Sequence, residues 1–299
     1  MLKYLLTFIK GIGMGAADVV PGVSGGTIAF MTGIYEELID SLRSIDHAAI
    51  SLLLKGKVNE FWLKINGKFL LTLFSGILLS IFTLARLMGY LLIHHPVPLW
   101  SFFFGLIIAS AIFILKHIDK WRIPYVLALV AGIAIAAWIS LVSPGETTEE
   151  LWFVFVSGMI AICAMILPGI SGSFILLLMG KYAFMMTAIK DFNIAVIVVF
   201  ALGAGLGLIS FSHFLGWLLK RYYKTTIALL SGFMAGSLVK VWPWKKPSGL
   251  AEGIDFPAMP SYYEQITGND PQLFLAVLFL LIGILLVWGL EIAAKKMNK

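Results

Sequence analysis

Six long apolar runs divide the chain, and each is a candidate for a membrane-spanning helix. A bilayer core needs roughly 20 helical residues, and the runs cover 69–92, 98–115, 124–142, 194–219, 226–241 and 272–290. Before each trio comes a further apolar segment, 5–39 or 151–189, which a Pro-Gly pair interrupts near its middle. Proline lacks an amide hydrogen and disfavours helix for the residue before it. Each interrupted segment is therefore predicted to form two short helices, as a re-entrant hairpin or a pair of short spans.

Composition supports an integral membrane protein. Hydrophobic residues make up 60% of the 299 positions and charged residues only 13%, with a mean hydropathy of +0.96. These values lie far outside the range of soluble domains. The apolar stretch at the N-terminus is short and Lys10 interrupts it, so we expect no cleaved signal peptide. The net charge of +6 is expected to reflect membrane topology, not nucleic-acid binding.

The basic residues are divided unevenly between the two sides that these spans define. With the N-terminus inside, sixteen of the 22 Lys and Arg residues fall on the cytoplasmic side. Five fall on the other side, namely Lys181, Lys190, Lys240, Lys245 and Lys246. Cytoplasmic loops are enriched in Lys and Arg, so both termini are predicted to face the cytoplasm. The segment 43–68, mixed apolar and basic, is predicted to lie on the cytoplasmic membrane surface.

The two halves of the chain match each other. The stretch "DVVPGVSGGT" at 18–27 has a near-copy, "MILPGISGSF", at 165–174, an offset of 147. Identical residues follow at the same offset, namely Gly33 with Gly180 and Tyr35 with Tyr182. After the segment 43–68 the offset becomes 127, with the identical pairs Gly76 with Gly203 and Gly105 with Gly232. We interpret 1–145 and 146–299 as repeats that together form one membrane domain.

Each repeat holds one returning hairpin and three spans, which is an odd number of crossings. The second repeat must then enter the membrane from the side opposite to the first. The predicted fold is an all-α integral membrane protein with two inverted-topology repeats, each a broken, re-entrant hairpin followed by three transmembrane helices. This plan is typical of secondary transporters, whose substrates bind at broken helices near the bilayer midplane.

Glycine and hydroxyl residues follow each Pro-Gly pair, where the helix resumes. Non-helical backbone at membrane depth is tolerated only where protein or water satisfies its polar groups. Free amides, a positive helix end and hydroxyls at one point suit a phosphate or carboxylate. Two copies at equivalent positions favour such a site over a simple kink or close helix packing. The candidate phosphate-binding residues are Gly22, Ser24, Gly25, Gly26, Thr27, Gly169, Ser171, Gly172 and Ser173.

A few ionisable residues lie within or beside the apolar segments, where they are costly and usually functional. Arg86, inside the first span, is a candidate to add charge to the phosphate site, and His213, 127 positions later, is a second cationic candidate. The alternatives are an Arg86 that reaches the membrane surface and a neutral His213. Asp18, which Met165 replaces in the second repeat, and Glu36 are candidates for coupling to H⁺ or Na⁺. No metal site or other cofactor is expected.

Two quoted stretches carry a family resemblance. "GIGMGAADVVPGVSGGTIAFMTGIYEELI" at 11–39 and "LPGISGSFILLLMGKY" at 167–182 resemble the bacterial polyprenyl-phosphate transporter family. The resemblance implies a flippase, not an enzyme, that returns undecaprenyl phosphate across the bacterial cytoplasmic membrane for synthesis of peptidoglycan and other envelope polymers. Its implied partners are this lipid and the bilayer. A homo-oligomer is compatible with the sequence but is not predicted.

Two alternative functions would use a similar site. Polyprenyl-diphosphate phosphatases also have inverted repeats and a "PGxSRSG"-like motif, but here Gly25 and Gly172 stand where that motif has Arg. A hydrolase also needs an acid, base or nucleophile near phosphorus, and none stands out. A transporter of a small soluble anion would need the same site without an opening to the lipid. We favour the lipid transporter, working by alternating access between the two repeats.

Overall fold

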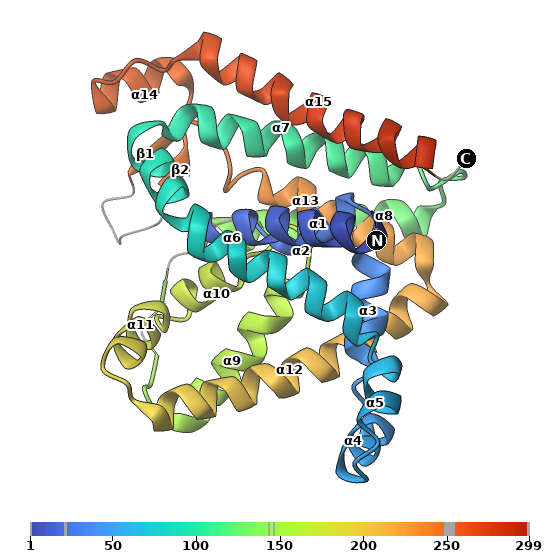
Figure 1. Cartoon of the computed structure of the whole chain (residues 1–299). Coiled ribbons are helices and arrows are strands. Elements are labelled where there is room, and N and C mark those ends of the chain that lie inside the picture. The colour runs from blue at the N-terminus through green and yellow to red at the C-terminus, as the bar shows by residue number, and fades with distance from the viewer. Residues whose placement is uncertain (1, 21–22, 143, 146, 248–254, 298–299) are drawn as a thin grey trace. The chain divides into compact units, whose positions relative to one another are not determined.

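The computed structural model describes residues 2–20, 23–142, 144–145, 147–247 and 255–297 (Figure 1). Five described helices are long and apolar enough to cross a membrane: α6 (Gly67–His94), α7 (Pro96–Leu115), α8 (Ile123–Leu141), α12 (Ile194–Arg221) and α15 (Leu273–Met297). A bent pair, α10 (Gly172–Leu178) and α11 (Tyr182–Lys190), adds a sixth if it counts as one span; its two helices meet at 106°. The prediction of an all-α, multi-pass membrane protein is confirmed.

The chain folds into two compact units, and both units draw on both sequence repeats. Unit 1 comprises Met1–Ala85 and Pro144–Tyr223, and unit 2 comprises Arg86–Ser143 and Lys224–Lys299. Both hairpins therefore belong to unit 1, together with α12 and the part of α6 up to Ala85. Unit 2 holds the remaining long helices, the short helix α14 (Pro260–Thr267) and a small antiparallel ribbon of β1 (Lys245–Pro247) and β2 (Asp255–Pro257).

Helix bounds in unit 1 recur at the two offsets found in the sequence. At an offset of 147, α2 (Gly25–Met31) corresponds to α10, α3 (Tyr35–Arg43) corresponds to α11, and the last residues of α1 (Leu2–Val19) and α9 (Leu151–Ile166) correspond. At an offset of 127, α6 corresponds to α12 at both ends. The local structure therefore repeats together with the sequence, although the orientation of the repeats in a membrane stays a prediction.

Two helix crossings in unit 1 rest on glycines that correspond between the repeats. α1 packs on α6, and α9 packs on α12, with backbone so close that a Cβ on either helix would run into a carbonyl oxygen of the other. The contact of Gly11 with the Leu73 carbonyl is equivalent to that of Gly158 with the Phe200 carbonyl. The contact of Gly76 with the Phe8 carbonyl is likewise equivalent to that of Gly203 with the Phe155 carbonyl. Small residues at such crossings let membrane helices approach closely, and here they hold each hairpin's entry helix against the long helix of its own repeat.

Crossings in unit 2 pair helices from different repeats. α7 lies along α15 (Figure 1), and α8 crosses α13 (Tyr223–Ser237). Glycines again set the contacts: Gly105 faces Leu280, Gly283 faces Phe102, Gly232 faces Leu129, and Gly132 faces Leu229. Each pair joins one helix from each repeat, so unit 2 cannot form from one repeat alone. α13 ends at Ser237, short of the expected run 226–241.

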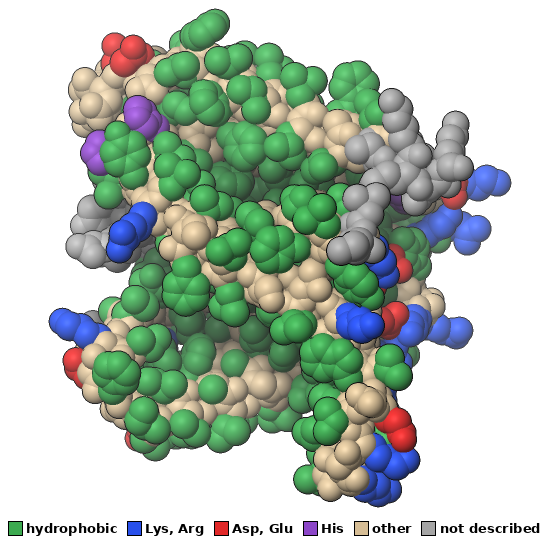
Figure 2. All heavy atoms as spheres, in the orientation of Figure 1, with side chains coloured by type: hydrophobic (Ala, Val, Ile, Leu, Met, Phe, Trp, Pro, Cys, Tyr) green, Lys and Arg blue, Asp and Glu red, His purple; other side chains and the backbone are tan. Residues whose placement is uncertain are grey.

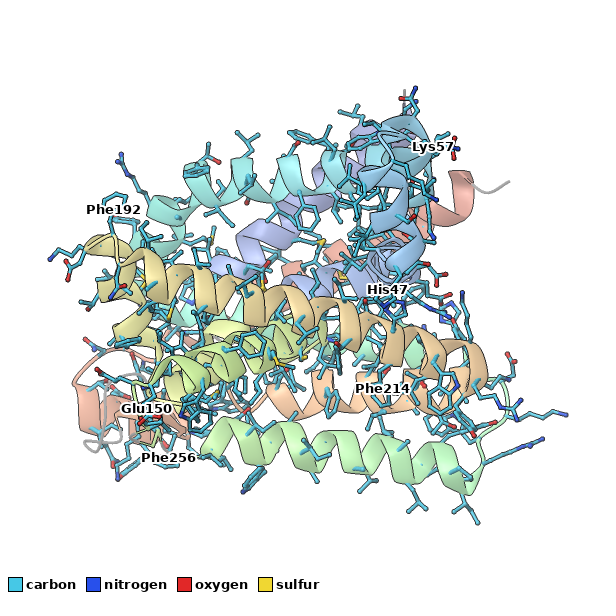
Figure 3. The ribbon with its side chains drawn as sticks, turned by 90° about the horizontal axis from the view of Figure 1, so that it is seen from below. His47, Lys57, Glu150, Phe192, Phe214 and Phe256 are labelled. Atoms are coloured by element: carbon cyan, nitrogen blue, oxygen red, sulfur yellow. The ribbon has the colours of Figure 1, made fainter. Side chains whose placement is uncertain are left out.

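The predicted surface segment 43–68 contains two short helices, α4 (His47–Leu54) and α5 (Val58–Lys64). Gly56, with φ 71°, forms the turn between them, and Figure 3 labels His47 at the start of α4 and Lys57 in this turn. Lys64 donates to Asp46 (2.6 Å), and this bond lowers the pKa of Asp46 below its ordinary value. Exposed side chains on the long helices are largely apolar (Figure 2), as lipid-facing surfaces are.

Candidate phosphate site in the paired hairpins

The helix breaks predicted at the two Pro-Gly pairs lie in unit 1. α1 ends at Val19 and α2 begins at Gly25; Pro21 and the candidate Gly22 lie outside the described residues. In the second hairpin α9 ends at Ile166, and Gly169 follows with φ 87°. Glycine adopts this left-handed conformation without steric cost. Together with the proline before it, which has no amide to continue a helix, it turns the chain into α10.

Ser24 caps the helix that follows the first break. Its backbone is extended, and its Oγ accepts a hydrogen bond from the Gly26 amide (3.1 Å). The same hydroxyl lies 3.3 Å from the carbonyl oxygens of Met165 and Leu167, to which it donates. Ser24 is buried. One hydroxyl thus caps the start of α2 and holds the end of α9, the equivalent helix of the other repeat.

Two further side chains of the first hairpin bind the second break. The Gly169 amide donates to Thr27 Oγ1 (2.9 Å), and Tyr35 Oη donates to the Ile166 carbonyl (3.1 Å). Thr27 and Tyr35 are both buried. Gly26 permits this approach, since a Cβ there would lie 2.7 Å from the Ile166 carbonyl oxygen. The structure therefore brings the two predicted motifs together, joined by hydrogen bonds between side chains and backbone.

Asp18 places a carboxylate where the sequence predicted an anion. It lies one residue before the end of α1, and its Oδ1 accepts a hydrogen bond from the Gly25 amide (2.7 Å). The amides of Gly25, Gly26 and Gly169 are thus all bonded within the protein. Carboxylate and phosphate oxygens accept from the same donors. A phosphate reaching Gly25 would have to replace the Asp18 carboxylate.

The second motif has fewer such bonds. Ser171 precedes α10 as Ser24 precedes α2, yet within the described part of the chain its side chain caps none of the first amides of α10. Instead its Oγ lies 2.9 Å from Ser173 Oγ. Gly172 packs close to the Ala161 carbonyl, and Ser173 is half-buried. The candidate hydroxyls of this motif therefore face each other, not the end of α1.

The other ionisable candidates lie away from these bonds. Arg86 follows the last residue of unit 1 on α6; its side chain is exposed and forms no hydrogen bond or ion pair with a described residue. His213 is half-buried on α12 and its Nδ1 donates to the Ile209 carbonyl (2.8 Å). Glu36 is exposed in the first turn of α3. Among the described residues, no group of three His, Cys, Asp or Glu side chains is placed to hold a metal.

Sequence reasoning missed several polar residues that lie in or beside the hairpins. Lys10 donates to the Thr32 carbonyl just after α2 (2.8 Å). Lys181, counted above among the five basic residues on the side opposite to the cytoplasm, is buried and donates to the Thr147 carbonyl (3.1 Å). Ser80, on α6 beside Gly15, is buried with no partner for its hydroxyl in the described structure. Tyr35 was also missed, although its match to Tyr182 in the sequence could have indicated it. The positions of Lys10, Lys181 and Ser80 depend on packing between segments far apart in sequence.

Comparison with known proteins identifies the family. Residues 14–252 match a family described as undecaprenyl phosphate translocase-like. The chain belongs to this family. A polyprenyl-phosphate transporter of Vibrio cholerae serotype O1 is 46% identical, over 99% of this chain and 98% of the relative. A polyprenyl-phosphate transporter of Staphylococcus aureus is 36% identical, over 80% of this chain and 86% of the relative. No solved structure matches.

Membership of the translocase-like family decides between a transporter and a phosphatase, two of the functions that the sequence left open. The family is named for translocation and both relatives are named as transporters. The chain is accordingly a membrane transporter, not a phosphatase. The described polar groups of the two motifs are backbone amides, hydroxyls and one carboxylate.

Proposed function

We propose that the protein carries polyprenyl phosphate, such as undecaprenyl phosphate, from the outer to the inner leaflet of the bacterial cytoplasmic membrane. Both termini then face the cytoplasm. The returned lipid serves again as the carrier for peptidoglycan and other envelope polymers. The names of the two relatives support the substrate, and the excess of Lys and Arg on one side supports the orientation.

The observation that carries this proposal is the pairing of two broken helices in unit 1. The breaks meet through Ser24, Thr27 and Tyr35 of the first hairpin, which bind the backbone of the second. Broken helices that meet in this way form the substrate sites of many secondary transporters. A phosphate head needs such polar groups at membrane depth, whereas an isoprenoid tail needs only lipid.

In the proposed cycle the phosphate and the Asp18 carboxylate exchange at the first motif. Binding of H⁺ or Na⁺ to Asp18 weakens its bond to the Gly25 amide, and the phosphate then takes that donor together with the amides and hydroxyls of both motifs. Arg86 and His213 supply positive charge along the path, and Glu36 is the second coupling candidate. Alternate opening of the two repeats exposes the bound head to one leaflet and then to the other.

Transfer in reconstituted vesicles tests the proposal. Labelled undecaprenyl phosphate in the outer leaflet is digested by an added phosphatase that cannot cross the membrane, so its protected fraction reports transfer. Wild-type protein should protect the label, and Ser24→Ala, Ser171→Ala and Arg86→Gln should slow this. Ser75→Ala is the control, because Ser75 is exposed and, in the described part of the chain, its hydroxyl bonds only to the Leu71 carbonyl of the same helix.

The outcomes separate the function from the site. Absence of transfer by the wild type would refute the function, and release of phosphate from the diphosphate lipid would do the same. Normal transfer by all three variants would refute only the site. Coupling is tested by imposing H⁺ or Na⁺ gradients: Asp18→Asn keeps an oxygen for the Gly25 amide but loses the charge, so transfer should lose its response to the coupling ion.

A further inference from the structure

A basic cavity lies at one end of unit 2, where α7 ends and α8 and α13 begin. It has a volume of about 350 Å³ and is lined by Asp119, Lys120, Arg122, Tyr125 and Lys224. Sites for small ligands begin near this size, at roughly 300 Å³. A second cavity of unit 2, of about 200 Å³, has a lining that is apolar apart from Lys116.

Several contacts fix the walls of the basic cavity. The turn after α7 is closed by hydrogen bonds from the Lys116 and Ile118 amides, and Ile118 itself is buried beneath the turn. Lys224, in the first turn of α13, donates to Asp119 (3.2 Å) across the cavity. Arg122 immediately precedes α8. The cationic groups are therefore presented by a short, anchored turn and two helix ends.

The charge of the lining fits one class of anion. Lys120, Arg122 and Lys224 carry three positive charges and Asp119 one negative charge, which leaves a net charge of +2. A phosphate monoester carries about −1.5 to −2 at pH 7, whereas the phosphodiester of a common phospholipid carries a single negative charge. The fork of Arg matches phosphate oxygens, and the Tyr125 hydroxyl is a further donor.

Two exposed apolar residues are sequence neighbours of the cavity lining. Trp121 and Ile123 flank Arg122 in sequence and are 46% and 76% exposed. Tryptophan is enriched at the level of lipid head groups, and an exposed isoleucine next to it suits an acyl or isoprenoid chain. A ligand with a phosphate in the cavity can therefore continue into lipid.

We propose that the basic cavity binds the phosphate monoester head of a prenyl lipid at the membrane surface. On the proposed topology this surface is cytoplasmic, so the cavity receives the carrier lipid in the inner leaflet. The lipid identity rests on the proposed function, while the preference for a monoester rests on the charge of the cavity. The residues that line the cavity belong to unit 2, and the hairpin motifs belong to unit 1.

Photolabelling of the full-length protein in nanodiscs tests the site locally. The probe is farnesyl phosphate with a diazirine on its first isoprene unit, and mass spectrometry measures the label on the peptide that contains Trp121 and Ile123. Lys120→Gln with Arg122→Gln should reduce this label at least about tenfold, because two charge-assisted bonds are lost. Lys116→Gln is the matched control; it removes one charge from the same turn but not from this cavity, and should leave the label unchanged.

Asp119→Asn gives a prediction of opposite sign. It raises the net charge of the lining and releases Lys224, so labelling at low probe concentration should increase, whereas a purely structural ion pair would give a decrease or no change. Equal labelling of the wild type and the double variant would overturn the proposal. Competition by phosphatidylglycerol as strong as that by unlabelled farnesyl phosphate would overturn the monoester preference, and equal competition by inorganic phosphate would overturn the lipid part. Because the assay involves no transfer, its result is independent of the vesicle experiment.

Discussion

The hairpins α2–α3 and α10–α11 have equivalent helix bounds but different hydrogen-bond partners. Each closes its first helix with the same motif, in which glycine, at φ 72° for Gly33 and 63° for Gly180, directs two amides back to the helix end. Beyond this shared geometry the first hairpin is bound to the end of α9 by three side chains. No described side chain of the second hairpin forms the reciprocal bond to the end of α1.

Three unmatched positions contribute to the difference. Gly26 corresponds to Ser173, Thr27 to Phe174, and Asp18 to Met165. Gly26 permits close approach of the α9 backbone, Thr27 accepts a hydrogen bond from the Gly169 amide, and Asp18 accepts one from the Gly25 amide. Their counterparts in the second repeat differ in residue type. Matched residues thus determine the local fold of each hairpin. The unmatched residues contribute to its different hydrogen bonds, together with Ser24 and Tyr35, which bind α9 although Ser171 and Tyr182 match them in the sequence. The two hairpins are not interchangeable, even though their helices correspond residue for residue.

Gly26→Ser should have the largest effect, because it gives the first hairpin the residue of the second. Its Cβ would lie 2.7 Å from the Ile166 carbonyl oxygen, so α2 and α9 must separate and the bonds of Ser24 and Tyr35 must lengthen. Overpacking of this kind costs typically about 1–3 kcal/mol of unfolding free energy, and lipid transfer should be lost. Thermal unfolding followed by Trp fluorescence and the vesicle assay measure the two effects.

The reverse exchange, Ser173→Gly, is the control for Gly26→Ser. Ser173 is half-buried and its Oγ is bonded to Ser171, so its loss should cost less than about 1 kcal/mol, mainly through helix propensity. Equal stability losses in the two variants would mean that close contact with α9 is not what distinguishes the hairpins.

Thr27→Val should have the next largest effect. Valine keeps the shape but removes the acceptor of the buried Gly169 amide, and an unsatisfied buried donor costs about 1–3 kcal/mol. Hydrogen exchange at Gly169 should become faster, while exchange within α12 should change little. Thr32→Val is the matched control: in the described structure the Thr32 hydroxyl bonds only to carbonyls of α2, and the change should alter stability by at most about 0.5 kcal/mol. Unchanged exchange at Gly169 in Thr27→Val would contradict the role given to this bond.

Local features of the hairpins could be predicted from sequence. Pro168 and Gly169 interrupt a helix by their own chemistry, and the offsets of 147 and 127 in the sequence reappear in the helix bounds. The predicted convergence of the two motifs also agrees with their contacts in unit 1. The asymmetry between Asp18 and Met165 was visible as well, because it is a difference in residue type.

Partners formed across long sequence separations could not be predicted. Ser24 and Ser171 are the same residue in equivalent motifs, yet among the contacts of the described residues only Ser24 caps a helix and binds another segment. Lys181 looks like a surface cation until its burial by distant residues is known. The division into two units was also hidden, because α7 packs on α15 and α8 on α13, across the repeat boundary. Such contacts depend on three-dimensional packing, about which the pattern of one chain carries little information.

Tyr35→Phe should show the smallest effect of the three, and Tyr182 supplies its control. Tyr35 is buried, and its hydroxyl donates to the Ile166 carbonyl. Phenylalanine keeps the edge contact with Phe30, whose ring centroid lies 4.9 Å away, so only the hydrogen bond is lost, at about 0.5–1.5 kcal/mol. Tyr182, at the equivalent position, is 42% exposed, and Tyr182→Phe should stay within about 0.5 kcal/mol. Thermal unfolding of both variants decides the matter: if both lose the same stability, the end of α9 is not held by the first hairpin as described, whereas a loss confined to Tyr35→Phe isolates one bond that the second hairpin lacks.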